Sequence, residues 1–155
     1  MAIIGSLMKT EMITVKPGDS VADAARTMSQ NHVGAVLVVE GGVMQGILSE
    51  RDVVSRVVAL GKDPSTTLVS EVATAEVVTV DVGTRVRKCA EMQFALDVRH
   101  LPVTENGKPV GILSSRDFLA YVAGGLERII DKLDYEETLG EGVDPYDHLG
   151  GSYGT

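Results

Sequence analysis

One motif that combines a hydroxyl, a guanidinium and a carboxylate occurs twice in the chain. The copies are residues 46–49, ending in Ser49, with Arg51 and Asp52, and residues 111–114, ending in Ser114, with Arg116 and Asp117. A strand that runs directly into a helix at the serine would expose unpaired backbone N–H groups beside the hydroxyl and the guanidinium, which favours a phosphate. The carboxylate only accepts hydrogen bonds, so it suits the two hydroxyls of a ribose and would repel a phosphate. The motif therefore predicts a nucleotide site.

The same spacing also has a purely structural interpretation. Ser-x-x-Asp before an apolar run is an ordinary helix capping box, and on spacing alone the cap is the better explanation. Arg51 and Arg116 change this balance, because a cap does not need them and a cation in the first turn opposes the helix dipole. The glycines at 46 and 111 are less informative, since each can simply relieve crowding at the end of a sheet.

An internal repeat supplies the elements that must position these residues. A shift of 65 residues pairs residues 13–54 with 78–119 without a gap, and 15 of the 42 paired positions are identical. Each copy predicts the order strand, helix, strand, strand, helix. The expected elements are 12–15, a helix with a capping box at Ser20, 35–39, 43–48 and a helix from 49; in the second copy they are 77–80, 84–96, 100–104, 109–113 and a helix from 115.

Neither copy buries enough surface for comfortable independent stability, because a three-stranded sheet with helices on one face leaves apolar surface uncovered. We therefore expect an α+β fold in which two βαββα repeats pack sheet to sheet about a pseudo-twofold axis. The expected divisions are 1–67 for the first repeat, 68–134 for the second with an extended C-terminal helix, and 135–155 for an acidic, Gly-rich, mobile tail.

The last helix carries an apolar stripe that is longer than its counterpart in the first repeat. The stripe consists of Phe118, Leu119, Val122, Leu126, Ile129, Ile130 and Leu133. Such a stripe either covers its own core or forms a dimer or partner surface, and the spacing alone favours neither interpretation.

Composition and charge exclude several classes of protein. Of 155 residues, 44% are hydrophobic and 23% are charged, as in soluble folded proteins. The net charge is −8, so no basic stripe for nucleic acid is expected. The longest apolar run, 33–39, is far shorter than the roughly 20 residues that cross a bilayer. With no recognisable secretory signal and a single cysteine, Cys89, the expected compartment is the cytoplasm.

The sequence lacks patterns typical of catalysis and metal binding. Cys89 lies on an apolar helix face, where we expect a small buried hydrophobe. His32, His100 and His148 do not recur at a ligand spacing, so no metal site is expected. No Ser-His-Asp arrangement, Walker loop or Gly-x-Gly-x-x-Gly after a strand can be placed, and we expect neither enzyme activity nor a catalytic cofactor.

The duplicated order, with the run Gly-h-h-Ser-x-x-Asp (h, hydrophobic) in both copies, resembles the tandem CBS domain, named after cystathionine β-synthase. The resemblance covers about residues 6–122. It implies a regulatory module that binds adenosine-containing ligands (AMP, ADP, ATP, NAD or S-adenosylmethionine) in clefts between paired sheets, without catalysis. It also suggests a flat homodimer.

The resemblance assigns roles to individual residues. Asp52 and Asp117 would hold ribose hydroxyls, and Ser49, Arg51, Ser114 and Arg116 would face phosphates. The backbone at the adenine edge corresponds to Met12, Ile13 and Thr14, and to Val77, Val78 and Thr79. Arg99, His100 and Pro102 lie in a stretch similar to the family's phosphate-facing strand, whereas 33–37 has no basic residue. The two sites are therefore expected to be unequal.

These observations favour a stand-alone sensor of adenine nucleotides, with a homodimer and an unidentified protein as expected partners. The alternative is a ligand-free structural or dimerisation module that regulates a protein partner, in which the Ser and Asp residues serve only as caps. An enzyme whose chemistry lies entirely in tertiary contacts is the least favoured interpretation.

Overall fold

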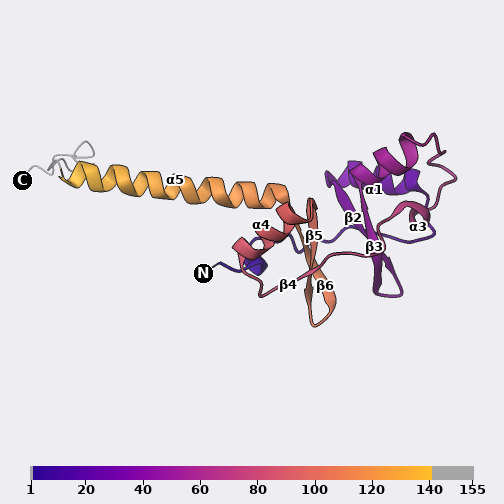
Figure 1. Ribbon diagram of the computed structural model, residues 1–155, viewed down its shortest axis with the longest axis horizontal. Coiled ribbons are helices and arrows are strands. Elements are labelled where there is room, and N and C mark those ends of the chain that lie inside the picture. Colours follow the sequence, from indigo (N-terminus) through magenta and orange to yellow (C-terminus); the bar gives the residue numbers. More distant parts are fainter. Residues whose placement is uncertain (1, 141–155) are drawn as a thin grey trace, which may run out of the picture. The chain divides into compact units, whose positions relative to one another are not determined.

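The structure, a computed structural model, describes residues 2–140 of the chain and the side chains of residues 2–136. The chain forms two compact units, Met1–Ser115 and Arg116–Thr155. The first unit contains both sheets, and the second contains nearly all of the last helix (Figure 1).

The first repeat has the predicted order of elements. Its elements are β1 (Thr14–Val15), α1 (Val21–Asn31), β2 (Ala35–Glu40), β3 (Val43–Ser49), α2 (Glu50–Val53) and the π-helical turn η2 (Val54–Val58). Helix α1 begins after Ser20, whose side chain accepts a hydrogen bond from the backbone N–H of Asp23. Only this half of the expected capping box forms, because the Asp23 carboxylate pairs with Arg26 at 2.6 Å. Val21, Ala24 and Met28 are buried, so the predicted apolar face of this helix is confirmed.

The second repeat follows the same order. Its elements are β4 (Val80–Asp81), α4 (Val86–Ala95), β5 (His100–Glu105), β6 (Lys108–Ser114) and α5 (Ser115–Gly140). Two further short helices, η1 (Ile4–Ser6) and α3 (Val69–Val72), precede the first strand of each repeat and were not expected from the sequence.

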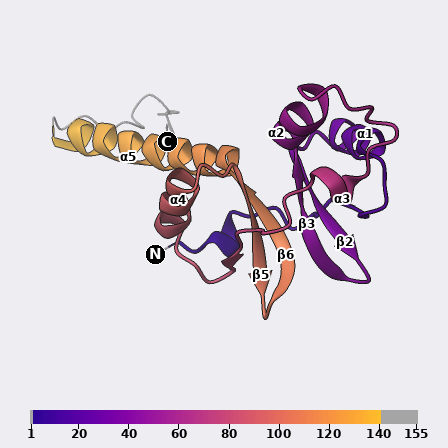
Figure 2. The same ribbon diagram turned by 45° about the vertical axis from the view of Figure 1, so that its right-hand side comes forward.

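Each repeat forms a three-stranded sheet, in the order β1-β2-β3 and β4-β5-β6. The first strand pairs in parallel with the second, and the second and third form an antiparallel hairpin. The hairpins turn at Gly41 and Gly42 and at Asn106 and Gly107, all with positive φ, as tight two-residue hairpin turns require. Strands β3 and β6 contact each other, and the two hairpins stand side by side (Figure 2). The expected α+β fold of two packed repeats is therefore confirmed.

The first strands are shorter than predicted and do not begin at 12 and 77. In the first repeat the backbone N–H of Leu37 still donates to the carbonyl of Ile13 at 3.1 Å, just before β1. The equivalent residue of the second repeat is Pro102, which has no N–H to donate to Val78. The ladder of β4 therefore begins only at Val80.

The segments that precede β1 and β4 are exchanged between the repeats. The N–H of Ile4 donates to the carbonyl of Thr84 at 2.9 Å, and 65 residues later the N–H of Val69 donates to the carbonyl of Asp19 at 2.9 Å. Both Ile4 and Val69 are fully buried, and Val69 belongs to the core of the first repeat. This reciprocal exchange accounts for the single compact unit that holds both repeats.

A second pair of exchanged contacts closes the sheets at their outer strands. Lys9 pairs with Ile112 of β6 through two backbone hydrogen bonds of 3.1 Å, and Thr74 pairs with Ile47 of β3 through bonds of 2.9 and 3.0 Å. The repeated glycine lies beside each crossing segment. A Cβ added to Gly46 would lie 2.6 Å from the carbonyl oxygen of Thr74, and one added at position 111 would lie 2.7 Å from that of Lys9. Glycine at these two positions therefore avoids a clash with the crossing segment, through its backbone at Gly46 and through both its backbone and the Met8 side chain at Gly111.

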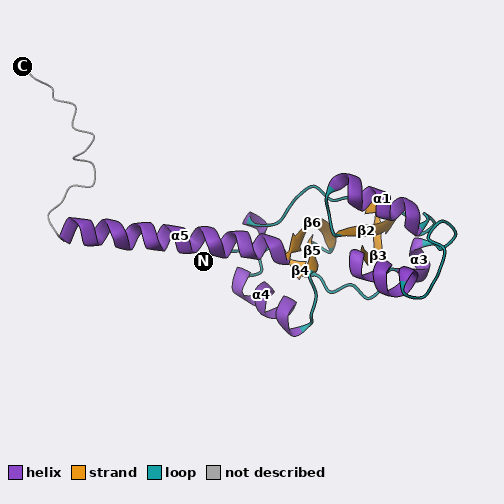
Figure 3. Ribbon diagram, turned by 90° about the horizontal axis from the view of Figure 1, so that it is seen from above, coloured by secondary structure: helices purple, strands orange, loops and turns teal. Residues whose placement is uncertain are grey.

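Helix α5 runs without interruption through 26 residues to Gly140 (Figure 3). Leu119, Val122, Leu126, Ile129 and Leu133 of the expected stripe are all exposed, between 51% and 70%. The helix continues past Tyr135, where we expected the tail to begin, and residues 141–155 lie outside the described part of the chain. None of the helices within residues 2–140 combines the length and the apolar character needed to cross a bilayer.

Candidate functional site

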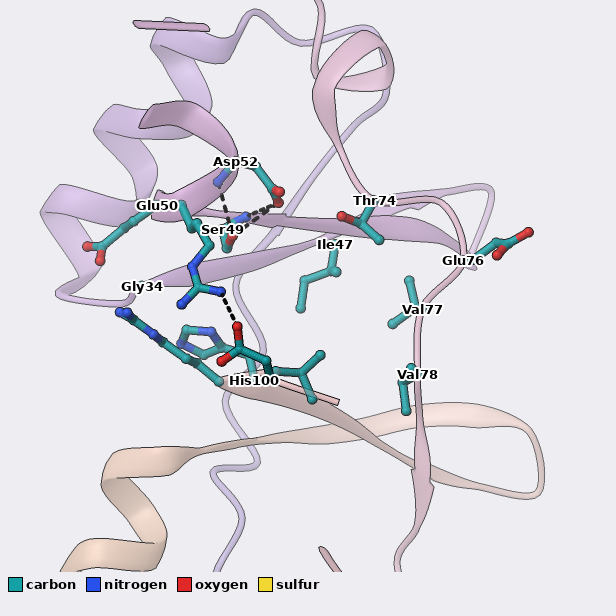
Figure 4. A pocket seen from close by; sticks show the side chains of 14 residues that line it. Gly34, Ile47, Ser49, Glu50, Asp52, Thr74, Glu76, Val77, Val78 and His100 are labelled. Atoms are coloured by element: carbon teal, nitrogen blue, oxygen red, sulfur yellow. Dashed lines mark hydrogen bonds and ion pairs between the residues drawn. The ribbon is translucent and has the colours of Figure 1, made fainter. Parts of the chain in front are cut away.

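A cleft of about 230 Å³ lies within the first unit and is lined by both repeats. Seven of the residues proposed from the sequence line it: Ser49, Arg51, Asp52, Val77, Val78, Arg99 and His100. Figure 4 shows Ser49 and Asp52 together at the end of β3, with Val77 and Val78 along the neighbouring segment and His100 across from Ser49. Residues 49–52 of the first repeat therefore share one cleft with residues 77–78 and 99–100 of the second.

Ser49 and Asp52 form a complete capping box at the strand-to-helix junction. The hydroxyl of Ser49 accepts a hydrogen bond from the N–H of Asp52 at 3.3 Å, and the carboxylate oxygen Oδ2 accepts from the N–H of Ser49 at 3.0 Å. The Ser49 hydroxyl also donates to Oδ2 at 3.1 Å. The interpretation of the Ser-x-x-Asp spacing as a helix capping box is therefore confirmed for Ser49 and Asp52.

The cap leaves part of the Asp52 carboxylate available. Its other oxygen, Oδ1, lies 3.7 Å from the guanidinium of Arg56, which also donates to the carbonyl of Val72 at 2.8 Å. A carboxylate has about four acceptor positions. Asp52 can therefore cap the helix and still accept a ligand hydroxyl through Oδ1 at the cleft wall.

Arg51 crosses from the first repeat to the second. Its guanidinium lies 3.2 Å from the carboxylate of Asp97, a residue 46 positions later in the chain. Asp97 has a φ of +50° just after α4, a left-handed conformation that Asp and Asn tolerate better than most residues. Arg51 therefore faces an acid in this structure, and a phosphate would have to compete with Asp97 for it.

His100 and Glu50 share one edge of the cleft beside Gly34. A Cβ added to this glycine would lie 3.3 Å from the imidazole ring and 3.4 Å from the carboxylate of Glu50. The Arg99 side chain is exposed, and its guanidinium has no ion-pair partner among the described residues. The cleft lining thus includes an imidazole, a carboxylate and a guanidinium that has no ion-pair partner within the described part of the chain.

Val77 and Val78 bring main chain to the cleft wall. No backbone hydrogen bond within residues 2–140 engages either residue, because the chain leaves its pairing with β3 at Thr74 and joins β5 only at Val80. Pro102 does not line the cleft, but it has no backbone N–H that could donate to the carbonyl of Val78 and so leaves this carbonyl available. Main-chain groups at 77–78 are therefore available to a ligand, whereas the Ile13 carbonyl is occupied.

The remaining proposed residues do not line this cleft. Thr79 directly precedes β4, Met12 and Ile13 precede β1, and Thr14 lies in β1. Ser114 ends β6, and Arg116 and Asp117 stand in the first turn of α5, in the second unit; Ser114 and Asp117 both make polar interactions. A second site built on these residues stays a prediction.

Three acids of the cleft were missed by the sequence reasoning: Glu50, Glu76 and Asp97. Glu50 lies inside the Ser-x-x-Asp motif and Glu76 directly precedes Val77, so their positions beside proposed site residues could have identified them from the sequence. Asp97 had no such signal, because its contact with Arg51 joins two distant parts of the chain.

Cys89 lies in the interior of the protein, outside the cleft. Cys89 is fully buried, and burial raises the pKa of its thiol, which confirms the expected small buried hydrophobe. Within the described part of the chain, no group of three or more His, Cys, Asp or Glu side chains is placed to hold a metal ion.

Comparisons with known proteins agree on one family. The CBS domain family matches residues 4–59 and 69–124. The chain is 34% identical over 117 residues to the CBS domain-containing protein YhcV of Bacillus subtilis, covering 76% of this chain and 83% of that protein.

Two solved structures have the same fold. A putative signal-transduction protein with CBS domains from Burkholderia ambifaria is 31% identical with a TM-score of 0.76, covering 78% of this chain and 93% of that one. The CBS domain protein PAE2072 from Pyrobaculum aerophilum, complexed with AMP, is 26% identical with a TM-score of 0.69, covering 75% and 89%.

Proposed function

The chain belongs to the CBS domain family, with two CBS domains in tandem, and from this premise we propose that it is a regulatory module that binds an adenine nucleotide in the cleft between its repeats. Tandem CBS domains are regulatory modules, and one relative of this fold was solved with AMP. The proposal covers sensing of AMP, ADP, ATP or NAD in the cytoplasm, without catalysis.

The observation that carries the proposal is the composition of one cleft. Main-chain groups at Val77 and Val78 are available to an adenine edge, Oδ1 of Asp52 to a ribose hydroxyl, and the Arg99 guanidinium to a phosphate. The ligand would contact both repeats at once. It would regulate by binding one arrangement of the protein more tightly than another, since a ligand shifts an equilibrium only by its differential affinity.

Calorimetric titration with AMP tests the proposal. We expect Arg99→Ala to weaken binding by about 10- to 150-fold, because a hydrogen bond to a charged partner contributes about 1.5–3 kcal/mol. Arg87→Ala is the matched control, since Arg87 is an exposed arginine on α4 that pairs with Glu91 and does not line the cleft. Equal affinities for Arg99→Ala and wild type would contradict the proposed phosphate position.

A ligand-free structural module is the second candidate, and two contacts favour it. Oδ2 of Asp52 is fully used by the cap, and Arg51 is paired with Asp97. Melting with saturating nucleotide separates the candidates, because a ligand at 100 times its dissociation constant adds about 2.7 kcal/mol of stability. No shift with AMP, ADP, ATP or NAD would favour the structural module.

We also propose that the protein is a homodimer in which α5 takes part. The exposed apolar positions of α5 follow a spacing of three and four residues, which is typical of helices that pair along a seam. A second copy of the same helix would cover this stripe.

A further inference from the structure

Carboxylates outnumber guanidiniums among the side chains that line the cleft. The acids are Glu50, Asp52, Glu76 and Asp97, and the guanidiniums are those of Arg51 and Arg99. Glu76 points away from the middle of the cleft, whereas Ser49 and Asp52 lie together at its wall (Figure 4). The cleft is therefore not a general attractor of anions.

Only one guanidinium of the cleft is unpaired among the described residues. Arg51 lies 3.2 Å from Asp97, so this acid already neutralises it. Arg99 has no such partner. A Cβ added at Gly34 would lie 3.4 Å from the carboxylate of Glu50 and 3.3 Å from the His100 ring, so an acid and the imidazole share this edge of the cleft.

We propose that this cleft selects adenosine ligands with a single phosphate and disfavours di- and triphosphates, with Asp97 and Glu50 as the specificity-determining residues. The inference rests on the proposed function, because it concerns the same cleft. One phosphate matches the unpaired guanidinium of Arg99. Every further phosphate adds negative charge near the carboxylate of Glu50 and would have to compete with Asp97 for the guanidinium of Arg51. Like charges brought together at a binding site lower affinity and confer specificity.

Titrations of AMP and of ATP, in magnesium-free buffer of low ionic strength, measure this selectivity. For the wild type we expect AMP to bind about tenfold more tightly than ATP. Asp97→Asn removes one carboxylate and releases Arg51 while keeping a residue that tolerates the φ of +50°. We expect this variant to bind ATP about three- to fivefold more tightly, with a smaller change for AMP, since ion pairs at exposed positions have modest energies.

Asp23→Asn is the matched control. Asp23 pairs with Arg26 on α1, so the change also removes one carboxylate and releases one guanidinium, but neither residue lines the cleft. We expect the ratio of the two affinities to stay at the wild-type value. Glu50→Gln, a second neutralising change, should shift the ratio in the same direction as Asp97→Asn.

The outcomes separate the two proposals. If neither AMP nor ATP binds, the selectivity is wrong, and if ADP and NAD also fail to bind, the proposed function is wrong as well. If the wild type binds ATP as tightly as AMP, the selectivity is wrong and the nucleotide site stands. If Asp23→Asn shifts the ratio as much as Asp97→Asn, the assignment of the residues is wrong, because the net charge of the protein would then explain the preference.

Discussion

Replacing Gly46 with alanine tests the exchanged segments that hold the two repeats together. The added Cβ would lie 2.6 Å from the carbonyl oxygen of Thr74, which is backbone and cannot rotate away. To relieve this contact, the segment around Thr74 must move from β3. That movement breaks or lengthens the two backbone hydrogen bonds between Ile47 and Thr74, of 3.0 and 2.9 Å.

The magnitude follows from these contacts. Each hydrogen bond contributes about 0.5–1.5 kcal/mol net, and forcing an extra carbon into a packed site costs about 1–3 kcal/mol. Alanine also reduces the conformational entropy of the unfolded chain, which raises the free energy of unfolding by about 0.4–1 kcal/mol and offsets part of this loss. We expect Gly46→Ala to lower the free energy of unfolding by about 2–4 kcal/mol, and the Tm by about 4–16 °C.

Thermal and urea unfolding, followed by circular dichroism, measure this change against a matched glycine. Gly18 has no atom within 4 Å of its added Cβ and no positive φ, so Gly18→Ala should leave stability unchanged or raise it by about 0.4–1 kcal/mol. Gly111→Ala should resemble Gly46→Ala, because its Cβ would lie 2.7 Å from the carbonyl oxygen of Lys9. If Gly46→Ala unfolded at the same temperature as Gly18→Ala, the close contact between Gly46 and the backbone of Thr74 would be refuted.

Two further predictions concern the buried thiol and the last helix. Burial raises the pKa of the Cys89 thiol above its ordinary value, so a smaller fraction of Cys89 is thiolate at pH 8 than of a free cysteine. A thiol reagent should therefore label Cys89 only after denaturation. Rapid labelling of the folded protein would contradict the burial of Cys89. Leu126→Lys places a charge in the exposed apolar stripe of α5 and should convert the proposed homodimer to a monomer. Light scattering measures the oligomeric state of both proteins. A wild-type protein that is already monomeric would contradict the proposed dimer.

The sequence alone determined the features that depend on near neighbours in the chain. The 65-residue repeat predicted two copies of the same order of elements, and the spacing of Ser49 and Asp52 offered a helix cap as one of two interpretations, which the structure contains. Helical spacing also identified the buried face of α1. These predictions succeeded because capping, turns and apolar periodicity involve residues a few positions apart.

Tertiary structure alone decided which residues share a cleft. Asp52 lies with Val78 and Arg99 because the repeats exchange their N-terminal segments, and this exchange is made largely by backbone hydrogen bonds, which leave little trace in residue types. The pairing of Arg51 with Asp97 likewise joins segments 46 residues apart. The charge that a ligand meets therefore depends on contacts between distant segments, which local patterns do not specify.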